Sequence, residues 1–161
     1  MSIFPEKTGQ TTTSAAALWY PYDAEPIDAV TKWALKSSIG FSNLDPKNAE
    51  WQSKLSINHA QLGDILSAQK DLPGALTSYR ISLAIREKLA KADPTNAQWQ
   101  TDHASCLAKV AQTISSASGD KQEVKGLVAY GLTIIGALEK KHPLAAEAKE
   151  IRVRLEKLRG S

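Results

Sequence analysis

From residue 26 onward, apolar residues recur every three or four positions, the spacing that places them on one face of an α-helix. No stretch alternates apolar and polar residues in the way a half-buried strand does. Short polar, Gly- or Pro-containing breaks divide the pattern into about six helices, joined by short loops that favour antiparallel neighbours. We therefore expect an all-α protein, with helices over residues 26–39, 46–69, 72–92, 94–115, 121–142 and 143–159.

Acidic residues mark where several of these helices should begin. Asp45 and Asp93 each precede a proline, which predicts an aspartate N-cap followed by proline in the first helical turn. Asp71 is the predicted N-cap of the helix that follows it. Asp120 and Glu123 have the spacing of a capping box.

The chain also repeats itself. Residues 45–52, DPKNAEWQ, return as DPTNAQWQ at 93–100, with six of eight positions identical and an offset of 48 residues. Self-similarity at a period of tens of residues is typical of stacked repeats, in which each unit buries its apolar face against a neighbour. The sequence therefore predicts a repeat array.

Within the first unit, the order Gly63, Ala75, Tyr79 resembles the tetratricopeptide repeat. In that family small residues meet where two helices approach most closely, and a large side chain fills the space beside them. In the second unit Gly126 and Tyr130 align with Ala75 and Tyr79 if the preceding turn contains a three-residue insertion. Residues 29–33 look like a preceding half-unit.

The resemblance covers residues 26–142, although the 48-residue period exceeds the usual 34 of this family. Such long units look like those of multidomain bacterial signalling proteins. The resemblance implies a short right-handed α-α superhelix over residues 26–161, closed by a C-terminal capping helix and preceded by an extended arm over 1–25.

As a function, the resemblance implies a non-enzymatic adaptor or regulatory scaffold that binds a peptide or helix of another protein in a groove. The lysine–asparagine pattern that grips a C-terminal carboxylate in chaperone-binding members is absent, because Ala60 and Asp64 occupy those positions. An alternative is a sensory segment of a larger signalling protein that self-associates as a homo-oligomer through the end of the array. When the groove positions of this family are transferred to the present sequence, the groove residues are Ile57, Ala60, Asp64, Ser67, Ser105, Ala108, Gln112 and Ser115.

Charge is distributed unevenly along the chain. Net charge is +3, but residues 121–161 contain nine Lys and Arg against five Glu, a net charge of +4. The last helix should place Leu144, Ile151, Leu155 and Leu158 on one apolar stripe and its basic residues in solvent. Because no aromatic residues are interleaved with these charges, the pattern argues against a nucleic-acid partner.

Other features exclude further classes. The longest apolar stretch, residues 126–138, is about 13 residues, against the roughly 20 needed to cross a bilayer. We expect a cytoplasmic protein, because Cys106 is the single cysteine and the first residues lack a basic start followed by an apolar run. The chain has no Gly-rich loop between a strand and a helix and no Gly-Lys-Ser/Thr sequence, which excludes a phosphate-binding loop.

Several residues have both a chemical and a structural interpretation. His103 and Cys106 share a helix face, but two ligands do not make a zinc site, so a buried cysteine and a surface or half-buried histidine are expected. Trp51 and Trp99 recur at one repeat position and are interpreted as inter-repeat core. We therefore expect neither catalytic residues nor a cofactor or metal. In the arm, three aromatic residues should pack against the array, namely Trp19, Tyr20 and Tyr22.

Overall fold

A computed structural model describes residues 36–40, 43–141 and 143–160 of the chain. These residues contain no strand, and the expected all-α class is confirmed for them. The aromatic cluster at 19–22 and the half-unit at 29–33 lie outside the described residues. Residues 36–40 and 43–44 are helical, and five longer helices follow: α2 (Ala49–Ala68), α3 (Leu72–Ala92), α4 (Ala97–Ser116), α5 (Lys121–Lys141) and α6 (Ala146–Arg159).

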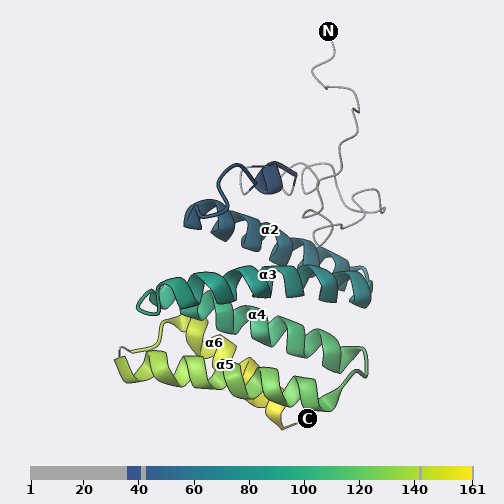
Figure 1. The fold of residues 1–161 in the computed structure, drawn as a ribbon. Helices are drawn as coiled ribbons and strands as arrows, with labels where there is room; N and C mark the ends of the chain where they lie inside the picture. Colours follow the sequence, from purple (N-terminus) through teal and green to yellow (C-terminus); the bar gives the residue numbers. More distant parts are fainter. Residues whose placement is uncertain (1–35, 41–42, 142, 161) are drawn as a thin grey trace.

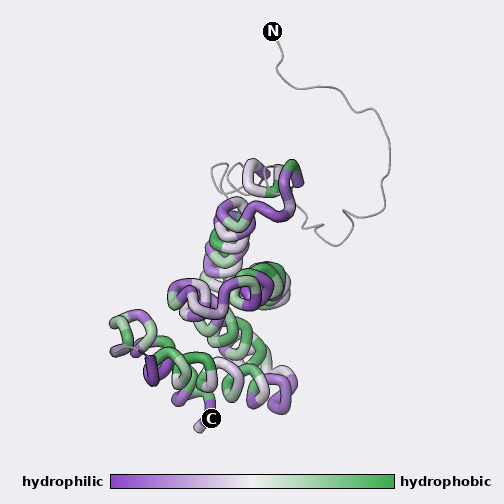
Figure 2. The backbone as a smooth tube through the Cα atoms, turned by 60° about the vertical axis from the view of Figure 1, so that its left-hand side comes forward, coloured by the Kyte–Doolittle hydropathy of each residue, from purple (hydrophilic) through white to green (hydrophobic). Residues whose placement is uncertain are grey.

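The helices form a stack in chain order. Each helix from α2 to α5 packs against the next, and α6 packs against both α4 and α5 at the far end of the stack (Figure 1). Figure 2 shows hydrophilic residues at the helix ends and connections, with apolar stretches along the helices between them. One cluster of buried apolar residues runs through α2 to α6. No helix in the described part of the chain is both long and apolar enough to span a membrane.

The two repeated segments begin their helices later than predicted. Asn48 and Asn96, not the preceding aspartates, are the N-caps: each side chain accepts a 3.1 Å hydrogen bond from the backbone N–H three residues on. Asp45 and Asp93 instead begin a tight turn, since each carbonyl accepts from the N–H of the asparagine three residues later. Proline suits the second position of such a turn. The Asp-Pro-x-Asn signal therefore specifies a turn followed by a cap.

The predicted close approach of α2 and α3 is confirmed. A Cβ atom added at Gly63 would lie 2.5 Å from Cε1 of Tyr79, closer than any real contact allows. Ala75 on α3 is fully buried, as a small residue at a narrow helix crossing should be. Gly63 therefore provides the space that the Tyr79 ring fills.

The predicted alignment of the second unit is wrong. Gly126 is exposed, and a Cβ added there would meet nothing, while Tyr130 is 44% exposed. The backbone shows the correct alignment: the N–H of Ala75 bonds the carbonyl of Asp71, and the N–H of Val124 bonds the carbonyl of Asp120. Val124, 49 residues after Ala75, is therefore its counterpart, so the turn contains one extra residue rather than three.

The predicted capping box at the start of α5 is replaced by two other contacts. The Asp120 carboxylate accepts from the N–H of Gln122 at 2.7 Å. The Glu123 carboxylate lies instead 2.7 Å from the guanidinium of Arg80 on α3. A contact between helices thus takes the place of the local one.

The last helix covers the second unit as expected. Ile151 and Leu155 are buried, and Leu144 and Leu158 are partly buried against the same core. A Cβ added at Gly131 of α5 would lie 2.8 Å from Leu155, which explains a glycine for which the sequence showed no reason. The predicted apolar stripe is therefore confirmed for Ile151, Leu155 and Leu158, whereas Leu144 lies in the connection before α6 begins at Ala146.

Candidate functional site

A polar recess of about 350 Å³ opens where the C-terminal halves of α2 and α4 face each other. We call it the inner recess. The start of α3 and one side chain of α6 complete its walls, so it depends on the packing of four helices. Its polar lining residues are Asp64 and Ser67 from α2, Tyr79 from α3, Lys109, Gln112, Thr113 and Ser116 from α4, and Arg154 from α6.

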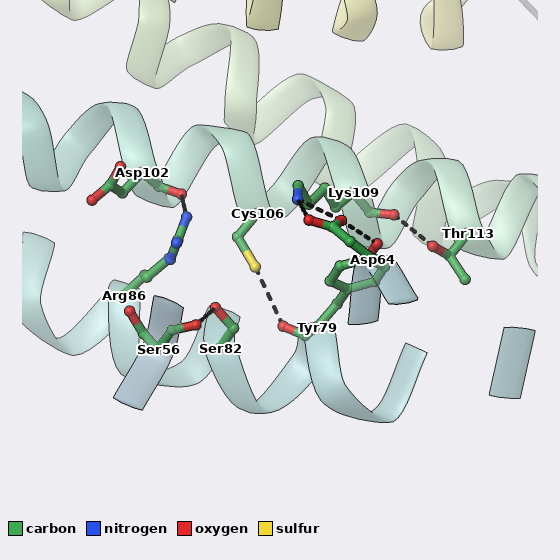
Figure 3. A network of polar contacts seen from close by, with 9 residues as sticks. All are labelled: Ser56, Asp64, Tyr79, Ser82, Arg86, Asp102, Cys106, Lys109 and Thr113. Atoms are coloured by element: carbon green, nitrogen blue, oxygen red, sulfur yellow. Dashed lines mark hydrogen bonds and ion pairs between the residues drawn. The ribbon is translucent and has the colours of Figure 1, made fainter. Parts of the chain in front are cut away.

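A charged cluster joins three helices in this recess (Figure 3). The Tyr79 hydroxyl donates to Asp64 Oδ1 at 2.6 Å, and Lys109 Nζ lies 2.6 Å from both Asp64 oxygens. The Lys109 ammonium also lies 5.5 Å from the centre of the Tyr79 ring, within cation–π range. The cluster links α2, α3 and α4 and pairs the charge of Lys109 with that of Asp64.

Tyr79 acts in this cluster only as a donor. Burial, and then the hydrogen bond and negative charge of Asp64, raise the pKa of its hydroxyl well above the ordinary value. The phenol therefore stays protonated at physiological pH. Its ring belongs to the core, since Tyr79 is 4% exposed, while its hydroxyl reaches the recess.

The predicted groove residues divide into three groups. Asp64, Ser67 and Gln112 line the inner recess. Ala60 and Ala108 are buried, so a ligand could not reach them in this arrangement. The other three, Ile57, Ser105 and Ser115, are at least partly exposed but do not line the recess.

Sequence reasoning missed five of the eight polar lining residues. On α4 the residues that face α2 are Lys109, Thr113 and Ser116, each one position after a residue predicted from the family resemblance. These polar residues, spaced four and then three apart, form a helix face that the sequence could have revealed. From the sequence, Tyr79 is expected only to fill the space beside the close contact of two helices, not to reach a site. Arg154 joins only through the orientation of α6 against α4, which the apolar stripe of α6 does not specify.

The basic face of α6 adjoins the recess. Arg154 lines both the inner recess and a neighbouring open surface formed with Lys149, Val153 and Lys157. Within the described ranges, none of these three cations forms an ion pair, whereas Arg152 bonds both oxygens of Glu139 at 3.0 and 2.6 Å. The recess is therefore bordered by three cations that form no ion pair with a described carboxylate, although Glu150 lies on the same surface.

A second, narrower crevice lies in the same furrow, at the N-terminal halves of α2 and α4. Ser53 and Ser56 of α2, Arg86 and Leu89 of α3, and Trp99 and Asp102 of α4 line it. We call it the Arg86 crevice. Trp51 and Trp99 are both half-buried and lie outside the main apolar cluster, which differs from their interpretation as core.

The candidate thiol and imidazole lie inside the helix packing. Cys106 is fully buried, its Sγ donates to the Tyr79 carbonyl at 3.3 Å, and burial raises the pKa of the thiol, which opposes thiolate chemistry. His103 is 2% exposed, so its predicted surface or half-buried position is wrong. Its ring packs edge-on against Tyr130, with centroids 5.4 Å apart. Over the described ranges, no three His, Cys, Asp or Glu residues gather in a metal-binding group.

Comparison of the chain with models of known protein families, with curated proteins and with solved structures found no match. The resemblance to the tetratricopeptide repeat therefore stays a prediction from the residues quoted above.

Proposed function

We propose that this chain is a protein-interaction module that binds an acidic, extended peptide segment in the inner recess. In this proposal the helices form a short right-handed superhelix whose concave side is the furrow between α2 and α4. The supporting observation is the recess itself, a polar hollow built from four helices and bordered by Arg154.

The lining suits a peptide backbone. Ser67 and Gln112 offer a hydroxyl and an amide that can accept and donate hydrogen bonds to peptide N–H and C=O groups, whereas the buried Thr113 hydroxyl already donates to the Lys109 carbonyl. An extended segment presents such groups along its whole length, whereas a helix has already satisfied them. An extended ligand therefore matches a polar lining better than an amphipathic helix does.

The charge border favours an acidic ligand. Lys149, Arg154 and Lys157 follow one another along α6 beside the recess, with Glu150 as the one acidic residue on the same surface. Such an arrangement attracts an acidic segment and orients it before contact. Because these cations are exposed, the attraction should weaken with salt.

The test is selection of peptides from a random displayed library on the wild-type chain, followed by affinity measurement on the strongest synthetic peptide. Arg154→Glu should weaken binding by about tenfold or more, because it places a repelling charge on the recess border. Arg159→Glu makes the same charge change on α6 at an exposed residue that lines neither surface, and should change the affinity by less than about twofold.

Three outcomes would contradict the proposal. The library could yield no peptide, the selected peptides could lack acidic residues, or the two charge reversals could weaken binding equally. Circular dichroism of both variants checks that α6 stays helical.

A further inference from the structure

The Arg86 side chain is a buried cation for which the structure shows no counter-ion. Arg86 lies on α3 and is 9% exposed. Its Nη1 donates to the backbone carbonyl of Asp102 at 2.7 Å, and its Nε is buried without a partner. No carboxylate of the described chain lies within ion-pair distance of it.

Neighbouring groups are already occupied (Figure 3). The Ser56 carbonyl accepts from the Ser82 hydroxyl at 2.7 Å, and the Ser56 hydroxyl donates to the Ser53 carbonyl. The Asp102 carboxylate points away from the guanidinium and accepts from Gln98 at 3.0 Å. The crevice therefore offers Arg86 one carbonyl oxygen, and the Asp102 carboxylate that also lines it forms no ion pair with the guanidinium.

Packing of the helix pair does not require an arginine here. In the second unit the counterpart of Arg86, 49 residues later, is Ile135, which is fully buried in the apolar core. An unpaired buried charge opposes folding, because the desolvation of the ion is not recovered. A cation kept at this position suggests that its partner arrives from outside.

We propose that the Arg86 crevice binds a carboxylate, supplied by an aspartate or glutamate side chain of the peptide that occupies the inner recess. This inference rests on the proposed function and adds a second anchoring point. A guanidinium donates two parallel hydrogen bonds to a carboxylate, a geometry that a single carbonyl cannot match. Nε is the donor without a partner in this structure.

The two sites lie on one furrow. Tyr79, in the recess, and Arg86 are seven residues apart on α3, which is about 10 Å along a helix. An extended chain covers that distance in about three residues. The ligand should therefore contain an acidic residue about three positions from the segment that lies against Tyr79.

Binding requires a movement of Trp99. The crevice is too narrow in this structure for a water molecule, and the half-buried indole of Trp99 forms part of its wall. Entry of a carboxylate must displace that ring. The Trp99 indole N–H and the Arg86 Nε–H are therefore two local reporters of occupancy.

The experiment is nuclear magnetic resonance of the full ¹⁵N-labelled chain, titrated with N-acetyl-glutamate N-methylamide. The matched neutral probe is N-acetyl-glutamine N-methylamide, at constant ionic strength. We expect saturable shifts of both reporters with the acidic probe in the millimolar range, and none with the neutral one. Absence of a saturable shift, or equal shifts with both probes, would overturn the inference.

Two variants make the test specific. In Arg86→Gln the Trp99 response should vanish, and a response that persists would overturn the inference. Asp102→Asn removes the one negative side chain from the lining and should tighten binding of the acidic probe severalfold; weaker binding would show that Asp102 supports the site in another way and would contradict the mechanism.

The experiments distinguish failure of this inference from failure of the proposed function of the inner recess. Arg154→Glu should leave the response to the small probe unchanged, because Arg154 does not line the Arg86 crevice. Loss of selected-peptide binding with an intact probe response would reject the proposed function alone. Intact peptide binding without a probe response would reject only this inference.

Discussion

The two helix pairs have the same helix lengths but differ in the residues that they bury. The pairs α2–α3 and α4–α5 each consist of a 20-residue and a 21-residue helix, and both first helices start from the same turn and asparagine cap. On the second helices, however, the inward positions differ in chemistry. Where α3 has Ser78, Tyr79, Ser82 and Arg86, α5 has Leu127, Val128, Gly131 and Ile135.

The difference follows from what each helix contacts. Helix α3 lies between α2 and α4 and reaches both the inner recess and the Arg86 crevice, whereas α5 packs against α4 and α6. In the described part of the chain, the buried polar side-chain atoms without a partner all belong to the first pair, on His59, Ser78 and Arg86. Unsatisfied polar groups that weaken the core are thus confined to the first pair, and one of them, Arg86, lines a candidate site.

The largest effect is expected at the closest helix contact. Gly63→Leu should destabilise the protein by about 3 kcal/mol or more, because even one added carbon overlaps the Tyr79 ring. Urea denaturation followed by circular dichroism measures the change. The matched control is Gly126→Leu, at an exposed helical position with open space, which should be neutral or stabilising. Equal losses in both variants would show that the first pair is not packed as described.

Acid should affect the first pair through His59. Burial lowers the pKa of His59 to about 4, so the folded state holds the ring neutral while the unfolded chain protonates it near pH 6.5. The stability contribution is therefore present above pH 6.5 and is lost as pH falls toward 4, by up to about 3 kcal/mol.

His59→Leu tests this assignment, because leucine is the residue of the second pair at the same position, Leu107. The variant should flatten the decline in unfolding free energy between pH 6.5 and 4. Burial also lowers the pKa of His103, so part of the slope should remain. An unchanged slope would assign the acid sensitivity elsewhere.

Replacing Arg86 of α3 by an apolar residue, as at the equivalent position of α5, should remove the desolvation cost of the buried charge. Arg86→Met, an apolar side chain of similar length, should leave the protein as stable as wild type or stabilise it by about 1–2 kcal/mol, since replacing an unpaired buried ion removes its desolvation penalty. Thermal unfolding at neutral pH is the measurement. Ile135→Met is the control for the shape change and should be slightly destabilising. A loss of more than about 2 kcal/mol in Arg86→Met would mean that its bond to the Asp102 carbonyl is a stabilising contact.

The smallest effect is expected for the ion pair that joins the first helices of the two pairs. Asp64 is half exposed and Lys109 is 23% exposed, so a double-mutant cycle of Asp64→Asn and Lys109→Met should give a coupling below about 1 kcal/mol. The fully solvated Glu50–Lys54 pair on α2 should give less than half of that. A coupling of several kcal/mol would make this cluster the main link between the pairs.

Local patterns in the sequence were sufficient for the helical elements. Apolar spacing of three and four placed the helices, the repeated octapeptide related α2 to α4, and the stripe on α6 predicted its docking. The Gly63–Tyr79 contact was also predictable, because a glycine within an apolar helix face requires a large side chain opposite. Except for the octapeptide, whose two copies are 48 residues apart, this information lies within about 20 residues, and helix geometry fixes which side chains of one helix share a face.

The sequence indicated Asp64, Ser67 and Gln112, but only the tertiary structure decided how the rest of the site is assembled. Lys109 meets Asp64 across 45 residues of chain, and Arg86 meets the Asp102 carbonyl across 16. Both contacts depend on the rotation and axial shift of whole helices. An error in the length of a turn changes which residues of the next helix face inward, as the wrong alignment of Gly126 and Tyr130 shows. That shift is set by the combined packing of the core, so no local signal encodes it. The burial of His103 and the entry of Arg154 into the recess have the same origin.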